Sequence, residues 1–332
     1  MVERQERLPA RETVDEVAPG IARIQLPIMK FAEKGKVNLD LVRILRANVR
    51  EPNQVVGDFY SLASCNDVGH RRLVDMMKEI GLASLDGLGE FIFSRTHQAM
   101  LERIKTLPRG SWSNELVVDG YDQPVKLAVT ISTHEDHIAV DFTGTDPMSR
   151  WGINCPISYS KAYACYALKC VVAPDVPNNT ASLDFVKLSS PVNILNAVRP
   201  APVALRHVFG HMVPDLVFGA MAKALPGRIL AEGAGALWNI HISVRPAPGA
   251  DGRRAEVLMF NSGGMGARPG LDGLSATAFP SGVHTMPIEA TEHTGPIVIW
   301  RKEFRPDSGG AGEYRGSSNQ RLLFYPILRR KK

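Results

Sequence analysis

The spacing of apolar residues predicts helices over the first third of the chain. A run of apolar residues at helical spacing follows the possible caps Asn38 or Asp40 and should end before Pro52. The same spacing predicts helices over 70–80 and 88–107, each followed by glycine or proline stop signals. We expect the apolar faces of these helices to pack a core and to carry no chemistry.

Near Ser111 the pattern changes to short apolar or alternating runs. Turn clusters separate the runs 116–118, 125–131 and 138–142, which favours an antiparallel meander. Further elements are expected as helices at 160–172 and 211–225, and as strands at 240–244, 255–260, 297–304 and 321–325. This order indicates an α+β fold, in which an N-terminal helical segment precedes a mostly antiparallel β-sheet with interspersed helices.

These patterns divide the chain into four expected parts. Residues 1–15 are read as a flexible N-terminus, 16–110 as a mainly helical part, 111–326 as a β-rich α+β part, and 327–332 as a basic tail. The only boundary with a change of pattern is the one near Ser111.

Composition is typical of a soluble globular protein. Of 332 residues, 44% are hydrophobic and 22% charged, and 39 Lys and Arg oppose 34 Asp and Glu for a formal net charge of +5. Acidic residues are interleaved with basic ones, and the only dense basic run is 329–332, so we expect no nucleic-acid partner. No apolar stretch approaches the roughly 20 residues of a membrane span, and the charged N-terminus resembles no signal peptide, so a cytoplasmic location is expected.

Several common site motifs are absent from the sequence. The four cysteines form no C-x-x-C pair and are expected to be buried free thiols. The sequence contains no P-loop, no G-x-G-x-x-G fingerprint and no G-x-S-x-G elbow. His207 and His211 are four residues apart but lack an evident third ligand, and Glu289, Glu292 and His293 form the best local group. We assign no metal to either set.

Four patches concentrate residue types that rarely pack cores. In order, they are 48–52 with 57–58, 141–145 with 152–156, 261–267 with 271–273, and 287–292 with 307–316. Glycine permits positive φ and close backbone approach, and successive N–H groups can form a concave nest for an anion. Tight turns between strands are the alternative, and composition alone favours them.

The acids in these patches leave several roles open. Asp141 follows an alternating strand and precedes Thr-Gly-Thr, so it is a base, a ligand or an Asx-turn acceptor, and the sequence favours the turn. Glu289 and Glu292 would share one face of a helix but lie on opposite faces of a strand. Close together, they could act as acid and base; they could equally pair with Arg301 or Arg305.

In this order the four patches resemble the B-type family of N-methylhydantoinase and 5-oxoprolinase subunits, which also includes components of acetone and acetophenone carboxylases. The resemblance covers about residues 17–325. It rests on N-x-R…G-D, D-F-T-G-T…G-x-N-x-P, G-G-x-G-A…D-G and P-x-E-x-x-E…D-S-G-G-A-G-x-x-R-G. One departure is Ser317-Ser318 after Gly316, where the family usually has a second glycine.

The resemblance implies ATP-dependent hydrolysis of the C–N bond of a small cyclic amide. It places ATP and Mg on a partner hydantoinase A-like protein and no cofactor on this chain. Two alternatives stay open: a component of an acetone- or acetophenone-type carboxylase, and a non-catalytic subunit that keeps only the fold and the interface.

A second departure concerns the N-terminus. The family's metal-ligand segment should precede Glu16, and none is found there. We therefore expect the family's metal site to be missing and the chain to correspond to the larger C-terminal part of the subunit. That part would be a truncated gene product, a degenerate copy, or one half of a split subunit whose N-terminal fragment is a further partner.

The resemblance also suggests residue roles. Asp141 or Glu289 would position water or a proton, Glu292 would be the second carboxylate, and Arg315 would be the counter-charge to phosphate or oxyanion. The expected substrate- or phosphate-binding residues are Asn48, Arg50, Asp58, Thr143, Gly144, Thr145, Asn154, Gly263, Gly264, Gly266, Asp272, Asp307, Gly309 and Gly310. The hypothesis requires Asp141, Glu289 and Arg315 to converge on a single pocket.

Overall fold

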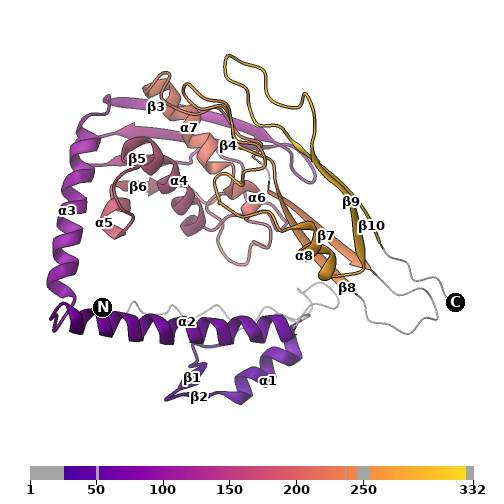
Figure 1. Cartoon of the computed structure of the whole chain (residues 1–332). Helices are drawn as coiled ribbons and strands as arrows, with labels where there is room; N and C mark the ends of the chain where they lie inside the picture. The colour runs from indigo at the N-terminus through magenta and orange to yellow at the C-terminus, as the bar shows by residue number, and fades with distance from the viewer. Residues whose placement is uncertain (1–25, 50–51, 236, 245–254, 327–332) are drawn as a thin grey trace. The chain divides into compact units, whose positions relative to one another are not determined.

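The computed structural model describes residues 26–49, 52–235, 237–244 and 255–326 (Figure 1). By its internal contacts the chain divides into two compact units, one up to Leu88 and one from Gly89 onward. The change from helices to strands near Ser111 lies inside the second unit.

In the first unit a short hairpin precedes two helices. Strands β1 (Ala32–Glu33) and β2 (Lys36–Val37) pair antiparallel, and α1 (Leu39–Asn48) follows. The Asn38 side chain accepts the backbone N–H of Leu41 at 3.1 Å, so of the two possible caps Asn38 caps the helix.

Helix α2 (Pro52–Glu79) begins well before the expected start at residue 70. Within α2 only Val56 is buried, but Val55, Phe59 and Leu62 recur at helical spacing in its first half, so the earlier start has a signal in the sequence. Its end was predicted correctly, because Gly81 adopts φ +71° just after the last turn. Helix α1 packs against α2.

The second unit begins with most of α3 (Asp86–Lys105) and contains a four-stranded sheet of order β3-β4-β5-β6. The strands are β3 (Gly110–Val118), β4 (Val125–Thr133), β5 (Ile138–Asp141) and β6 (Val186–Ser189). The first three form the expected antiparallel meander. Strand β6 was not predicted and pairs parallel to β5, since the chain returns to the sheet through α4 (Ile157–Val172) and α5 (Thr180–Leu183).

Helices α4 and α7 (Val213–Ala224) supply the rest of the main core. Helix α7 packs against α4 and against strands β3 and β4, and the short α6 (His207–Gly210) contacts α4. Fully buried side chains at this junction include Phe142, Leu168, Phe209, Leu216 and Met221. The core thus fixes the orientation of the α6–α7 segment.

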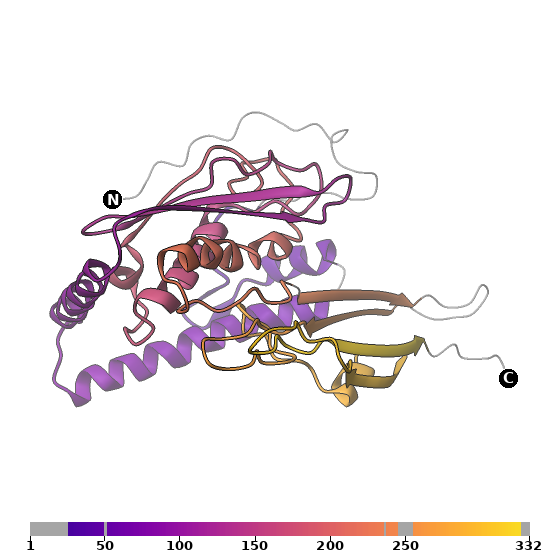
Figure 2. The same cartoon turned by 90° about the horizontal axis from the view of Figure 1, so that it is seen from above.

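Two β-hairpins complete the second unit. They are β7 (Leu237–Val244) with β8 (Ala255–Ser262), and β9 (Ile297–Phe304) with β10 (Gln320–Pro326). The hairpins lie side by side in Figures 1 and 2 and share a second apolar cluster that includes Val257 and Ile297. Helix α8 (Ile288–His293) packs against β9.

These elements confirm the α+β prediction, because all strand pairs except β5–β6 are antiparallel in the described residues. All four cysteines are free thiols, but the prediction that they are buried holds only for Cys155 and Cys165, since Cys65 and Cys170 are exposed. Within the described ranges, no helix has the length and apolar character that a membrane crossing requires.

Candidate functional site

The first predicted patch belongs to the first unit. Asn48 ends α1, where its side-chain amide donates to the Ile44 carbonyl at 2.7 Å. Asp58 is an exposed residue of α2, and Arg50 lies outside the described residues. The predicted binding roles of these three residues therefore stay predictions.

The second patch forms a tight turn at the end of β5. Asp141 Oδ1 accepts the backbone N–H of Thr143 at 3.0 Å and its hydroxyl at 2.8 Å, which is an Asx turn. Gly144 adopts φ +93°, and the buried Thr145 hydroxyl bonds both the N–H and the carbonyl of Ala128. The side chains of Asp141 and Thr145 thus have structural partners, as the turn alternative expects.

Asn154 is fully buried, and its side-chain amide binds four backbone groups of the surrounding loops. Its Oδ1 accepts the Ser149 N–H at 2.8 Å, and its Nδ2 donates to the carbonyls of Ser149, Trp151 and Pro202 at 2.8–2.9 Å. The amide therefore fixes the surrounding loop.

The third patch is a junction where several backbone segments meet at close range. A Cβ built on Gly266 would lie 2.0 Å from the Ala231 carbonyl oxygen, and one on Gly264, at φ +115°, would lie 2.2 Å from the Ser317 hydroxyl. The Met265 N–H donates to the Leu274 carbonyl at 3.1 Å. We call residues 231–234, 263–266, 272–275 and 315–317 the glycine junction; its glycines are required by close approach.

Asp272 and Arg315 join the third patch to the fourth. Asp272 Oδ1 accepts the Arg315 N–H at 2.8 Å, and the Gly273 N–H donates to the Arg315 carbonyl at 2.8 Å. The Arg315 Nε lies 4.0 Å from Asp272 Oδ2, and the guanidinium side chain is 61% exposed. The third and fourth patches therefore meet at this point, and the guanidinium remains accessible to an anion.

The loop 307–316 closes on itself. The Gly316 N–H donates to the Gly310 carbonyl at 2.9 Å, and a Cβ on Gly309 would lie 2.7 Å from the Gly316 carbonyl oxygen. Asp307 adopts φ +55° and is exposed. Here too, glycine permits close packing of backbone on backbone.

Glu289 and Glu292 lie on the helix α8, which settles the helix-or-strand alternative. Glu292 Oε1 accepts the Ile299 backbone N–H at 2.7 Å and so ties α8 to β9. Glu289 is exposed, and no described bond joins it to Glu292. Arg301 pairs with Glu303 at 3.7 Å rather than with either glutamate.

The described contacts do not bring the three predicted catalytic residues together. Asp141 ends β5 in the four-stranded sheet, whereas Glu289 lies on α8 beside β9 (Figure 1). No hydrogen bond, ion pair or cavity lining within the described ranges connects Asp141, Glu289 and Arg315. Their convergence stays a prediction.

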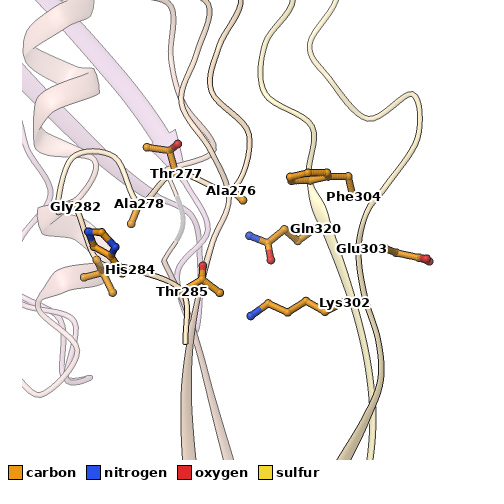
Figure 3. Close-up of a pocket in the computed structure, with 11 residues that line it drawn as sticks. Ala276, Thr277, Ala278, Gly282, His284, Thr285, Lys302, Glu303, Phe304 and Gln320 are labelled. Atoms are coloured by element: carbon orange, nitrogen blue, oxygen red, sulfur yellow. The ribbon is translucent and has the colours of Figure 1, made fainter. Parts of the chain in front are cut away.

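A cavity of about 560 Å³ adjoins the glycine junction (Figure 3). The segment after the junction and the facing strand ends line it, with Ala276, Thr277, Ala278, Gly282, Val283, His284, Thr285, Lys302, Glu303, Phe304 and Gln320. Gln320 links the two features, because its amide donates to the Ser262 carbonyl at 2.8 Å. None of the predicted site residues lines this cavity.

Sequence reasoning missed the cavity for a physical reason. Lys302 lies in an alternating strand, where a lysine usually indicates the solvated face. In the structure, its amine donates to the Met286 carbonyl at 3.0 Å, and burial lowers its pKa.

A buried polar row runs along α6 and α7. His207, His211 and Asp215 recur every fourth residue, and His211 and Asp215 are only 4% and 7% exposed. The His211 ring lies 5.6 Å from Tyr163 and 6.0 Å from His207, and His207 also contacts the Asn239 amide. The sequence analysis found the two histidines but not Asp215.

Burial shifts the pKa values of His211 and Asp215 in opposite directions, so that the pKa of the carboxyl lies above that of the imidazole. It lowers the pKa of His211 to about 4, with His207 adding to the shift. Burial raises the pKa of Asp215 to about 7, and the nearby Glu232 carboxylate adds to that shift. Near neutral pH the His211 imidazole is therefore neutral, and the Asp215 carboxyl is the group of this row that can give and take a proton. Among the described residues, no three His, Cys, Asp or Glu side chains are placed to hold a metal ion.

Comparison with known proteins gives one family. The family model for hydantoinase B/oxoprolinase matches residues 22–323. A relative from Pseudomonas sp. (strain NS671), named as a candidate B-type subunit of a D-/L-hydantoinase, is 29% identical over 92% of this chain and 53% of its own length. The chain thus spans about half the length of this relative, and the same holds for the caprolactamase beta-type subunit of Pseudomonas jessenii.

Two solved structures share the fold. The ATP-dependent caprolactamase from Pseudomonas jessenii superposes with a TM-score of 0.81 at 22% identity, over 91% of this chain and 54% of that one. A nucleotide-free acetone carboxylase superposes with a TM-score of 0.76 at 15% identity, over 89% and 42%. At these identities, the likeness concerns the fold alone.

Proposed function

The chain belongs to the hydantoinase B/oxoprolinase family, and on that premise we propose that it serves as a B-type subunit, or part of one, in an ATP-dependent enzyme that hydrolyses the C–N bond of a cyclic amide. The observation that carries the proposal is the family match over residues 22–323. The relative named as a B-type hydantoinase subunit supports it, since it aligns with 92% of the chain.

The reaction needs energy because an amide resists attack by water. The ring nitrogen donates electrons into the carbonyl, and this resonance is lost when the carbonyl oxygen attacks the γ-phosphate of ATP and ADP leaves. Water then adds to the activated carbon, and the C–N bond breaks as the nitrogen takes a proton, which leaves an acyl phosphate. A second water hydrolyses the acyl phosphate to the carboxylate and inorganic phosphate. We place ATP and Mg on a partner A-like protein and propose that this chain acts on the activated carbonyl carbon.

The glycine junction and its Asp272–Arg315 pair are the chain's best candidates for holding the developing oxyanion or phosphate. The exposed guanidinium of Arg315 supplies positive charge, and Asp272 fixes the backbone that carries it. The Asp215 carboxyl is a candidate for proton transfer. No group of described residues fits a metal, so we route no step through one.

Co-expression with the A-like protein encoded beside this chain tests the proposal. Purified complex is supplied with ATP and Mg, and ADP release is measured with 5-oxoproline, hydantoin or caprolactam. We expect one of these amides to stimulate ADP release and to yield a ring-opened product.

Two other outcomes would contradict the hydrolase proposal. ADP release that requires acetophenone or acetone together with bicarbonate would indicate the carboxylase alternative, whose fold this chain shares. A complex that assembles normally but releases ADP with neither amides nor ketones would indicate a non-catalytic subunit.

A further inference from the structure

The cavity in Figure 3 contains a cation that no described acid neutralises. Lys302 donates to one backbone carbonyl, that of Met286 at 3.0 Å, and takes part in no ion pair within the described ranges. Glu303 also borders the cavity, but its side chain points away from it (Figure 3) and lies 3.7 Å from Arg301 and 3.9 Å from Arg321. The Lys302 ammonium therefore retains donors and charge for a ligand.

A second polar group in the cavity also lacks a partner. The hydroxyl oxygen of Thr285 is shielded from solvent and makes no hydrogen bond in the structure. Figure 3 shows Thr285 and the Lys302 amine on facing walls of the same space. A buried hydroxyl without a partner costs free energy, which an acceptor between these two groups would recover.

The remaining walls define the rest of the ligand. Ala276, Ala278 and Phe304 give apolar surface, and the amide nitrogen of Gln320 is already used by the Ser262 carbonyl. The Lys302 ammonium and the Thr285 hydroxyl match one carboxylate, and His284 and Thr277 add polar groups to the same lining. A guanidinium, which suits phosphate better than a single ammonium does, is not among the residues of the lining.

We propose that this cavity binds a small molecule with one carboxylate, held by Lys302 and Thr285, with its uncharged ring against Ala276, Ala278 and Phe304. The inference rests on the proposed function in one respect: it makes the substrate a cyclic amide whose ring carries a carboxylate. Lys302 is then the residue that distinguishes such amides from uncharged lactams.

The surrounding fold supports each of the two cavity walls separately. Lys302 pairs with Leu322 across the β9–β10 hairpin. The opposite wall is anchored to the main core by Phe279, whose ring stacks on Phe218 of α7 at 6.1 Å between centroids. Substitution of Lys302 therefore changes the cavity without removing either anchor.

Binding to the isolated full-length chain tests this proposal without a partner or ATP. Calorimetry compares 5-oxoproline with 2-pyrrolidinone, which has the same ring but no carboxylate. We expect 5-oxoproline to bind more tightly, and Lys302→Met to weaken its binding roughly 10- to 100-fold, as loss of a charge-assisted hydrogen bond predicts. Binding of 2-pyrrolidinone should be unchanged, and Lys161→Met, an exposed lysine on α4, is the matched control.

Several results would overturn the proposal. They are equal affinity for the two ring compounds, full 5-oxoproline binding by the folded Lys302→Met chain, or inorganic phosphate binding in place of 5-oxoproline. Thr285→Val provides a second variant, for which we expect weaker 5-oxoproline binding, so the test stands if Lys302→Met does not fold.

The proposed function and this inference fail in different ways. Carboxylate binding by the isolated chain with no amide-dependent ADP release in the complex contradicts the function only. ADP release with caprolactam or hydantoin but not with 5-oxoproline, and no carboxylate binding, contradicts the inference only.

Discussion

At the scale of single residues, the polar side chains of the second patch act mainly within the fold. Asn154 binds four backbone groups and Thr145 binds two, so both side chains hold the local fold. Residue type and spacing alone cannot distinguish such a side chain from a ligand, because both functions use the same polar atoms. The distinction depends on which backbone groups lie within about 3 Å, and that is a property of the folded chain.

Asp215 gives a prediction for stability against pH. Its pKa is raised from 3.8 to about 7, so between these values the folded chain holds a proton that the unfolded chain has lost. This group therefore makes the chain less stable as pH rises through that window, by up to about 4 kcal/mol at pH 8. Asp215→Asn keeps an acceptor for the Gly233 N–H and removes the titration.

Denaturant unfolding at pH 5 and pH 8 measures the effect. The free energy of unfolding of Asp215→Asn, relative to wild type, should increase from pH 5 to pH 8. His211 acts in the opposite direction at low pH, since its lowered pKa of about 4 disfavours the folded state as pH falls below 6.5. If the difference in the free energy of unfolding between Asp215→Asn and wild type stays constant with pH, Asp215 is not buried as described.

At the scale of elements, periodicity identified the segments that have one apolar face. Strands β4 and β5 and helices α3, α4 and α7 were predicted close to their observed bounds, whereas β3 was predicted only over its last three residues. The first half of α2 was missed although Val55, Phe59 and Leu62 recur there at helical spacing, and β6 was missed because four residues carry too little pattern. The parallel pairing of β6 with β5 depends on the crossover through α4, which no local pattern specifies.

The glycine junction gives a prediction at this scale. Gly266→Ala should lower the free energy of unfolding by about 3 kcal/mol or more, because its Cβ would lie 2.0 Å from the Ala231 carbonyl oxygen and backbone would have to move. Gly89→Ala on α3 is the control, since nothing lies within 4 Å of its added Cβ and alanine favours helix. Thermal or denaturant unfolding compares the two; equal stability would contradict the close approach.

At the scale of the whole molecule, the sequence hypothesis places all four patches at one pocket, whereas the described contacts join only two of them. The third and fourth patches do come together at Asp272 and Arg315. The cavity beside them is built from 276–285, 302–304 and residue 320, which no motif connects. Such a site depends on the pairing of β9 with β10 and on the anchoring of Phe279 to α7, both of which are tertiary contacts.

Arg315 gives a prediction for the assembled enzyme. In the reconstituted complex, Arg315→Ala should lower kcat/KM for amide-dependent ADP release by roughly 10- to 100-fold, if its guanidinium stabilises an oxyanion. Arg301→Ala, which removes an exposed arginine that pairs with Glu303, should leave this rate unchanged. Undiminished activity of a folded Arg315→Ala complex would refute the role.

The glycine junction also places a constraint on biosynthesis. Residues 231–234 and 263–266 leave the ribosome before 315–317, yet Ser317 contacts the backbone at Gly264 and donates its N–H to the Met265 carbonyl. A growing chain therefore exposes this part of its backbone, with carbonyl groups still seeking donors, until the β9–β10 hairpin has emerged. During that interval, premature self-association competes with correct closure, and chaperone protection would matter most then.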